Sequence, residues 1–380
     1  MVVPSLHSRE SMMLYNKTKK QVQSVGYPLS MSLLFLAAVN VSPEAMAQGA
    51  NDEVVREAQP SQSVQNVLRE EHALFSDRLT IEPGISYSYS DRSNLALSGF
   101  LALDAIFLGN INVDTVESHT TTFDLSTRYG ITNRLEVELM IPYVYRSSQY
   151  ETIGAGASTG GLVEESVSQG DLGDISAGIY YRLLPEAEVR PDVVWNFSVR
   201  APTGKHPYDI RTNSRIVDDG EGGFENLTVP TSLPTGNGVW GVSSGLSFLK
   251  TVDPAIIFAN IGYTHNIKRS FDDIGSSEED VPGEVNLGDS IRLGFGTAFA
   301  LNERFSLSMS FTHQHAFETK VTTDGGPEQT VIGSSANAAS VNFGATYGLS
   351  DTTSIVTSVG IGLTDDAPDL TLDFRIPFQI

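Results

Sequence analysis

Two histidines and two acidic runs are the residues of this chain best suited to chemistry. His313 and His315 form an H-x-H pair, whose side chains share one face of a strand at a spacing that metal ligands can use. No third ligand accompanies them at a readable spacing, so polar residues near the external end of a strand are the preferred interpretation. The acidic runs 218–225 and 272–284 offer oxygen ligands for Ca²⁺ or for divalent bridges to lipopolysaccharide. They lack the regular spacing of a calcium loop, and we interpret them as solvated loops. No metal and no cofactor is predicted.

Enzymatic chemistry is not indicated by the remaining motifs. A hydrolase needs a nucleophile and a base within reach of each other, and nothing in the sequence pairs a Ser with a His. The glycines of GFGTAF (294–299) are not followed by a helix, as a dinucleotide fingerprint requires. PTG occurs at 202–204 and again at 234–236, and we interpret both as turns where strands leave a membrane. The chain is predicted not to be an enzyme.

Charged residues recur instead at every second position of a repeated pattern. In RLEVELMIPYVYR (134–146), one face carries Leu, Val, Ile and Tyr, and the other carries Arg134, Glu136 and Glu138. The same alternation occurs at 192–202, 290–300 and 371–380. A soluble barrel would place the apolar face inside, whereas a membrane barrel would place it against lipid and enclose the charges in water.

The alternation predicts about twelve strands. Their expected ranges are 79–90, 118–129, 134–147, 171–183, 192–203, 238–250, 255–268, 288–300, 304–318, 338–348, 353–363 and 368–379.

The connections between these strands alternate between short and long. Those at 131–133, 184–191, 251–254, 301–303 and 349–352 are short, whereas those at 148–170, 204–237, 269–287 and 319–337 are long and polar. Outer-membrane barrels have short periplasmic turns, long external loops and an even number of strands. The expected fold class is therefore all-β: a transmembrane antiparallel β-barrel of about 12 strands, with a short N-terminal helical segment.

The predicted facing follows from this fold class. A secreted soluble β-protein is the alternative, but faces rich in Gly, Ser and charge could not pack a dry core. Aromatic belts at the membrane interfaces are expected from Tyr143, Tyr145, Tyr181, Trp195, Trp240 and Tyr347. The residues predicted to line the lumen and act in transport are Arg128, Arg134, Glu136, Glu138, Asp174, Arg182, Asp192, Arg200, Arg292, Asp373 and Arg375.

The N-terminus is predicted to carry an export signal. Three lysines precede an apolar run at 29–39 and small residues at 45–47, which is the order of a signal peptide. The predicted division is 1–47 signal peptide, 48–77 periplasmic N-terminal segment and 78–380 outer-membrane β-barrel. Without residues 1–47 the chain has 20 basic and 44 acidic residues, a net charge of −24, which argues against nucleic acid as a partner. The absence of cysteine excludes the small disulfide-stapled class.

Two segments lie outside the strand pattern. Residues 63–75 place Val64, Val67, Leu68 and Phe75 at helical spacing, so a periplasmic helix, a plug or gate at the barrel mouth and a partly ordered leader all remain open. Residues 91–117 are unusually apolar for an external connection and are expected to fold into or against the barrel.

Three stretches carry a family resemblance: 79–100, TRYGITNRLEVELMIPYVYR (127–146) and GDLGDISAGIYYRLL (170–184). They resemble the outer-membrane secretion channel of the bacterial functional-amyloid (Fap) system. The last of them, with SVRAPTG (198–204), also resembles the wider superfamily of meta-pathway phenol-degradation transporters. The resemblance implies a twelve-stranded barrel, a homotrimer, a gating N-terminal region and an exported amyloid-like polypeptide as partner. The secretion channel has a longer N-terminal extension than this chain, so we carry over the architecture and transport class and leave the substrate open.

The expected function is a passive outer-membrane channel or transporter. Secretion-channel-like export of an unfolded polypeptide through a charged, hydrated lumen is favoured over uptake of small aromatic or hydrophobic compounds. A structural or adhesive surface barrel is the third hypothesis. In each case outer-membrane lipid and lipopolysaccharide surround the barrel.

Overall fold

The computed structural model describes residues 62–70, 75, 78–102, 105–153, 162–218, 224–275, 279–323 and 325–380. The predicted signal peptide at 1–47 and residues 48–61 lie outside these ranges. The part of the chain from Ala58 to Ile380 forms one compact unit.

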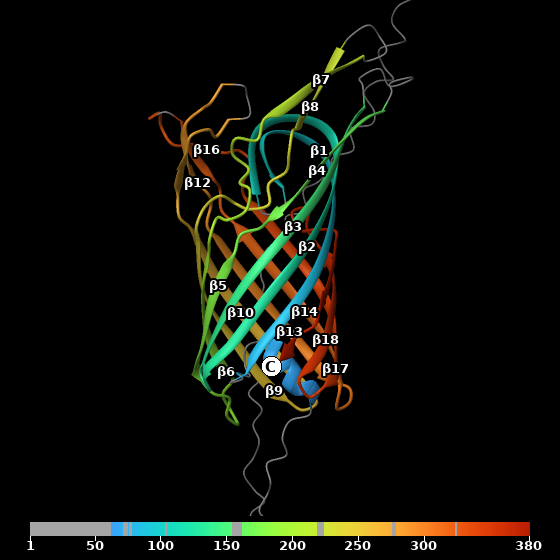
Figure 1. Ribbon diagram of the computed structural model, residues 1–380, viewed down its shortest axis with the longest axis vertical. Helices are drawn as coiled ribbons and strands as arrows, with labels where there is room; N and C mark the ends of the chain where they lie inside the picture. Colours follow the sequence, from blue (N-terminus) through green and yellow to red (C-terminus); the bar gives the residue numbers. More distant parts are fainter. Residues whose placement is uncertain are drawn as a thin grey trace, which may run out of the picture. The chain divides into compact units, whose positions relative to one another are not determined.

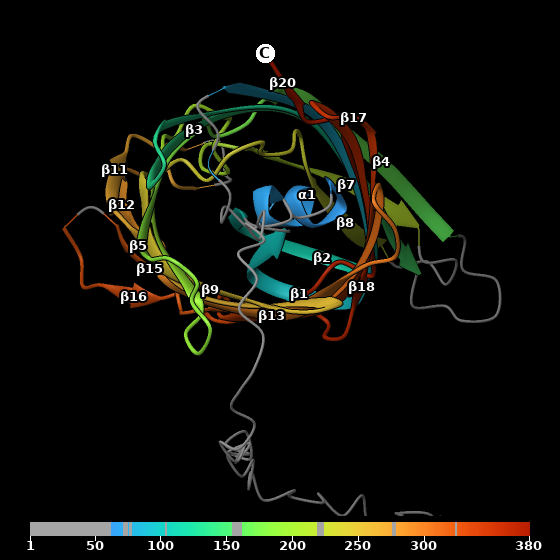
Figure 2. The same ribbon diagram turned by 90° about the horizontal axis from the view of Figure 1, so that it is seen from below.

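This unit is a closed antiparallel barrel of twelve strands, as the alternation predicted. Figure 1 shows the strands tilted around the barrel, and Figure 2 shows the closed ring. Each strand pairs with its neighbour along the chain, and the last pairs with the first, with Gly84 opposite Arg375. Closure pairs backbone groups that a sheet edge would leave free. In chain order the barrel strands are β1 (Leu79–Ala102), β2 (Ala105–Thr132), β3 (Leu135–Ile153), β5 (Ser176–Leu184), β6 (Asp192–Arg200), β9 (Gly241–Val252), β10 (Ala255–Asn266), β13 (Ser290–Ala300), β14 (Phe305–Ala316), β17 (Ala336–Ser350), β18 (Thr353–Gly362) and β19 (Leu370–Arg375).

The two ends of the barrel differ in their connections. Short connections at 133–134, 185–191, 253–254, 301–304 and 351–352 lie at one end, which we call the turn end. The opposite end, the loop end, carries further strands where the sequence predicted long polar connections. These are β4 (Leu162–Leu172), β7 (Thr212–Asp218), β8 (Phe224–Pro230), β11 (Arg269–Phe271), β12 (Gly283–Asn286), β15 (Lys320–Thr323) and β16 (Gln329–Thr330). Strand β20 (Phe378–Gln379) completes the sheet beside β1 and β18 at the turn end.

Two expected strands are interrupted. The strand expected at 171–183 divides into β4 and β5, because residues 173–175 leave the ladder and turn their polar groups toward a neighbouring loop. The strand expected at 368–379 divides into β19 and β20 at Pro377, which has no backbone N–H to donate.

The loop end has a hydrophobic core of its own. Strands β11, β12, β15 and β16 form a four-stranded sheet. The buried residues of this core are Tyr208, Val239, Phe271, Ile274, Val285, Leu287 and Val331. Burial raises the pKa of the Tyr208 phenol. The described parts of these connections are therefore packed against one another through buried apolar side chains.

The hairpin of β1 and β2 continues far beyond the barrel wall. Residues 91–102 and 105–117, part of a segment expected to fold into or against the barrel, lie within these two strands, and Asn112 pairs with Thr228 of β8. Residues 103–104 lie outside the described residues. The hairpin bends over the loop end (Figure 1), and its tip lies across the opening of the ring (Figure 2).

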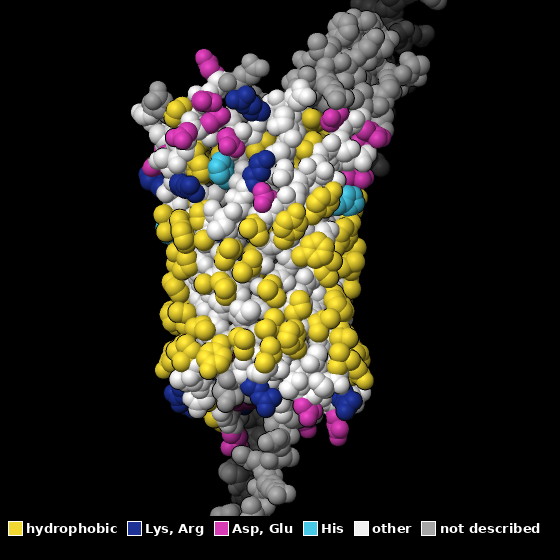
Figure 3. Space-filling model, in the orientation of Figure 1, with side chains coloured by type: hydrophobic (Ala, Val, Ile, Leu, Met, Phe, Trp, Pro, Cys, Tyr) yellow, Lys and Arg dark blue, Asp and Glu magenta, His cyan; other side chains and the backbone are white. Residues whose placement is uncertain are grey.

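The outer surface of the barrel is apolar. Figure 3 shows a broad hydrophobic band between two charged ends. Leu139, Ile141, Tyr143 and Tyr145 are all exposed on it, and of the residues expected in aromatic belts, Tyr181, Trp240 and Tyr347 are exposed as well. A band of this kind is the surface of a barrel surrounded by lipid. None of the described helices is long and apolar enough to cross a membrane.

Candidate functional site in the barrel lumen

A carboxylate held between two arginines dominates the lumen wall near the turn end. Glu82 of β1 forms ion pairs with Arg128 of β2 and with Arg375 of β19, the latter at 2.8 Å between Nη1 and Oε1. Glu82 and Arg128 are almost completely buried. Opposite charges in contact offset the cost of removing each from water, and two arginines beside one carboxylate leave this group with a formal charge of +1.

Strand β3 extends this charged wall. Register places Glu138 opposite Arg128, and Glu136 opposite Gly130. The Tyr180 hydroxyl donates to Glu138 Oε2 at 2.6 Å, and Glu136 is buried.

Other predicted lumen residues occupy separate positions. Arg182 and Asp192 form an ion pair at 3.1 Å between Nε and Oδ2. Asp373 accepts a hydrogen bond from Ser358 Oγ at 2.8 Å. Arg134 lies in the tight turn at 133–134 with an exposed side chain, and its backbone O accepts a hydrogen bond from the Arg182 N–H at 2.8 Å. The predicted residues therefore form several local groups rather than one site.

The two PTG segments and Asp174 form a structure that we call the clasp (Asp174, Pro202–Gly204 and Pro234–Gly236). Thr203 Oγ1 donates to Gly173 O and Thr235 Oγ1 donates to Leu172 O, each at 2.7 Å. The Asp174 carboxylate accepts from the backbone N–H of Gly204 at 3.0 Å and of Asn237 at 2.9 Å.

The glycines of the clasp allow its close packing. A Cβ added to Gly204 would lie 2.9 Å from the Gly236 Cα, which real structures do not tolerate. The repeated motif thus has a purpose beyond ending a strand: it fastens the connection between β6 and β9 to the interruption between β4 and β5.

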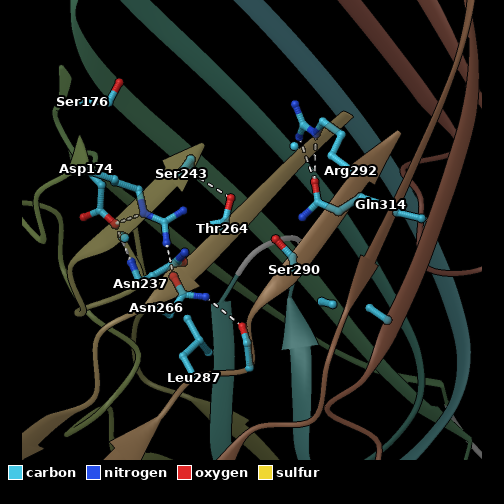
Figure 4. Close-up of a pocket in the computed structure, with 18 of the residues that line it drawn as sticks. Asp174, Ser176, Asn237, Ser243, Thr264, Asn266, Leu287, Ser290, Arg292 and Gln314 are labelled. Atoms are coloured by element: carbon cyan, nitrogen blue, oxygen red, sulfur yellow. Dashed lines mark hydrogen bonds and ion pairs between the residues drawn. The ribbon is translucent and has the colours of Figure 1, made fainter. Parts of the chain in front are cut away.

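A polar cavity of about 820 Å³ lies in the lumen beside the clasp (Figure 4). Most of the lining residues carry hydroxyl, amide or charged groups, among them Asp174, Ser243, Asn266, Ser290, Arg292 and Gln314, and Met140, Val144, Leu287 and Phe317 add apolar surface. Arg200 forms an ion pair with Asp174 at 3.8 Å and donates to Asn266 Oδ1 at 2.9 Å. On the other side of the view in Figure 4, Arg292 donates through Nε and Nη2 to Gln314 Oε1, at 3.2 and 2.8 Å.

The turn end of the lumen contains the helix α1 (Gln62–Glu70), which Figure 2 shows inside the ring. Val67 is buried against a lumen-facing apolar patch formed by Leu249, Ile256, Phe258 and Ala298. Ser63 donates to the 301–304 turn, from its backbone N–H to Glu303 O at 2.9 Å and from Oγ to Asn302 O at 2.6 Å. Of the positions left open in the sequence, α1 therefore occupies the barrel mouth.

Sequence reasoning missed three parts of this arrangement. Glu82 was overlooked although it alternates with Thr80 and Gly84 on the face that meets Arg128, and this was the available signal. The repetition of PTG was noticed, but nothing in it shows that the two copies touch. The lumen-facing patch under α1 was missed because Ile256 and Phe258 lie in an otherwise ordinary alternating strand.

The candidate metal ligands are not brought together. His315 Nδ1 hydrogen-bonds with Asn337 Oδ1 at 2.8 Å, and register places His313 opposite Leu293, which is exposed on the outer face. Within the described ranges, no group of three or more His, Asp or Glu is arranged to hold a metal ion.

Comparison with known proteins shows the fold. No family model matches the chain. The COG4313 outer membrane channel from Pseudomonas putida F1 is similar over 80% of this chain and 97% of its own, with 16% identity and a TM-score of 0.51. The P. putida toluene transporter TodX matches 85% of this chain and 93% of its own, with 10% identity and a TM-score of 0.42. The translocator domain of the autotransporter NalP from Neisseria meningitidis matches 84% and 96%, with 7% identity and a TM-score of 0.43. The first likeness shows a shared barrel fold. The resemblance to the transporter superfamily stays a prediction, and so does the specific resemblance to a secretion channel.

Proposed function

We propose that this protein is a passive channel of the bacterial outer membrane for small polar solutes. The observation that carries the proposal is a closed barrel with an apolar outer band around a polar cavity of about 820 Å³. Lipid can surround the apolar outer face, and water and solute can hydrogen-bond with the polar groups of the inner face. By analogy with outer-membrane barrels, the turn end faces the periplasm and the loop end faces the exterior.

The size and chemistry of the cavity define the class of solute. Its volume falls within the range of small-molecule sites, about 300–1,000 Å³. The hydroxyl, amide and guanidinium groups of the lining favour hydrophilic solutes over hydrocarbons, because an apolar solute cannot replace the hydrogen bonds that these groups make with water. The described apolar patch in the lumen is covered by α1 and so offers little surface to a hydrophobic solute.

Polypeptide export is the second candidate, and it rests on the sequence resemblance. An extended chain would need a continuous opening from end to end. It would have to displace α1 from the turn end and pass the clasp, which is held by at least four hydrogen bonds. We therefore assign α1 the role of a periplasmic gate and favour small solutes.

Conductance and solute permeation test this proposal. The purified protein in planar bilayers should conduct ions, and in vesicles it should admit small sugars and amino acids. A variant lacking residues 62–70 should conduct more than the full chain. No conductance and no permeation, with or without this helix, would instead support a structural or adhesive barrel.

A further inference from the structure

The cavity in the lumen carries a charge opposite to that of the chain. Its charged lining residues are three arginines, Arg146, Arg200 and Arg292, and two aspartates, Asp174 and Asp366, which gives a formal net charge of +1. The whole chain has a net charge of −22. A positive cavity within an acidic protein is a feature that the overall composition would not lead one to expect.

Both aspartates that line the cavity already have hydrogen-bond and ion-pair partners. Asp174 accepts two backbone N–H groups and lies against Arg200. Asp366 accepts from the backbone N–H of Asn337 at 2.7 Å and forms an ion pair with Arg92 at 3.5 Å. Neither carboxylate is left to attract a cation into the cavity.

Arg292 differs from Arg200 in its partners. Within the part of the chain that the structure describes, no carboxylate pairs with it, and its side chain is exposed to the lumen. Nε and Nη2 both donate to the single oxygen Gln314 Oε1, which fixes the plane of the guanidinium. The guanidinium group keeps its positive charge, and its remaining N–H donors are free to bind a ligand.

The wall beside Arg292 leaves room for that ligand. Arg292 is opposite Gly262 in the ladder between β13 and β10. A Cβ at Gly262 would meet only one atom within 4 Å, Ser244 O at 3.9 Å, so the space over this glycine is open. Ser290 and Thr264 also line the cavity, and their hydroxyls can donate to the same ligand.

We propose that Arg292 and Gln314, together with the open space over Gly262, form a recognition site for small solutes that carry a carboxylate or phosphate group. The inference rests on the proposed channel function and specifies its substrate class. A guanidinium fixed in plane matches both of these groups through paired N–H···O bonds. The acidic loop end does not prevent entry, because exposed charges are screened beyond about 8 Å at physiological salt.

Binding of succinate to the full-length protein in detergent tests the site, measured by saturation-transfer NMR. Wild type should bind succinate but not the neutral analogue succinamide. Arg292→Gln should weaken succinate binding about tenfold or more, as expected for the loss of a charge-assisted pair. Lys320→Gln removes a positive charge from the loop-end sheet outside the cavity and serves as the matched control, with unchanged binding. Displacement of succinate by inorganic phosphate identifies phosphate as a second ligand, and no displacement restricts the site to carboxylates.

A second variant keeps the test decisive if Arg292→Gln does not fold. Gly262→Leu keeps Arg292 and fills the adjacent space, and it should abolish binding while the folded barrel keeps its heat-modifiable mobility in gels. Succinate binding by Arg292→Gln and Gly262→Leu at the wild-type level would overturn the inference. If the protein conducts but does not bind succinate, the channel function stands and this inference fails. If it binds but never conducts, the site stands and the channel function fails.

Discussion

Replacing Val67 by Asp should open the proposed gate without unfolding the barrel. Val67 is 6% exposed and contacts the patch of Leu249, Ile256, Phe258 and Ala298. Burying a valine side chain contributes about 1.5–3 kcal/mol, and an unpaired carboxylate in the same place adds a desolvation cost. The docked state of α1 should thus lose at least ~2–3 kcal/mol, which shifts its population ratio by about 30- to 150-fold.

Two assays report the position of the helix. Single-channel recording should show the conductance of the variant rising to that of a protein without residues 62–70. Trypsin should cleave after Arg69 faster than in wild type, because an undocked helix is accessible. The thermal unfolding of the barrel should change little, since the strand ladder closes without α1.

Val189→Asp is the matched control. It makes the same substitution at the same end of the barrel, at a side chain that is 93% exposed, and should change neither assay. Wild-type conductance and wild-type protection of Arg69 in Val67→Asp would refute the reasoning. A large fall in barrel stability would also refute it, because α1 would then be part of the fold rather than a gate.

Three further predictions follow from the facing and the clasp. Leu139→Lys places a charge on the outer band and should cost about 2–4 kcal/mol of folding free energy in vesicles, measured by urea titration. Glu138→Gln should fold normally and change the reversal potential in a salt gradient; if these two effects were exchanged, the assigned faces would be wrong. Gly204→Ala forces a Cβ to within 2.9 Å of backbone across the clasp and should cost about 1–3 kcal/mol, seen as faster hydrogen exchange of the Asn237 amide. Gly262→Ala is the control, because a Cβ at this position meets open space, and its Asn237 amide should exchange at the wild-type rate. If the Asn237 amide exchanged equally fast in Gly204→Ala and Gly262→Ala, the packing of the clasp would be contradicted.

The strands and the class of barrel could be predicted because their signal is local. Alternation of apolar and charged side chains is a property of a short stretch, and residues 134–146 are enough to assign two faces. The order of short and long connections then indicates which ends of the strands lie together. Twelve expected strands correspond to the twelve of the barrel, and the differences include interruptions such as that at 173–175 and the extension of β1 and β2 beyond their expected ranges.

Contacts within the lumen could not be predicted in the same way. Glu82 reaches Arg375 across the seam where the first and last strands meet, at a separation of 293 residues. The sequence places both residues on an inward face, but it does not state the register that brings them into contact. The same holds for the clasp, where two copies of PTG meet only because the connection between β6 and β9 folds back on itself.

The sequence by itself determined that this chain forms ribbons with one apolar and one polar side, because side-chain alternation follows from the geometry of a single strand. Only the tertiary structure decided that α1 lies within the turn end, that the clasp lines the lumen cavity and that Arg292 faces open space. Each of these depends on which distant strands become neighbours, and that is settled by closure of the whole barrel rather than by any segment of the chain.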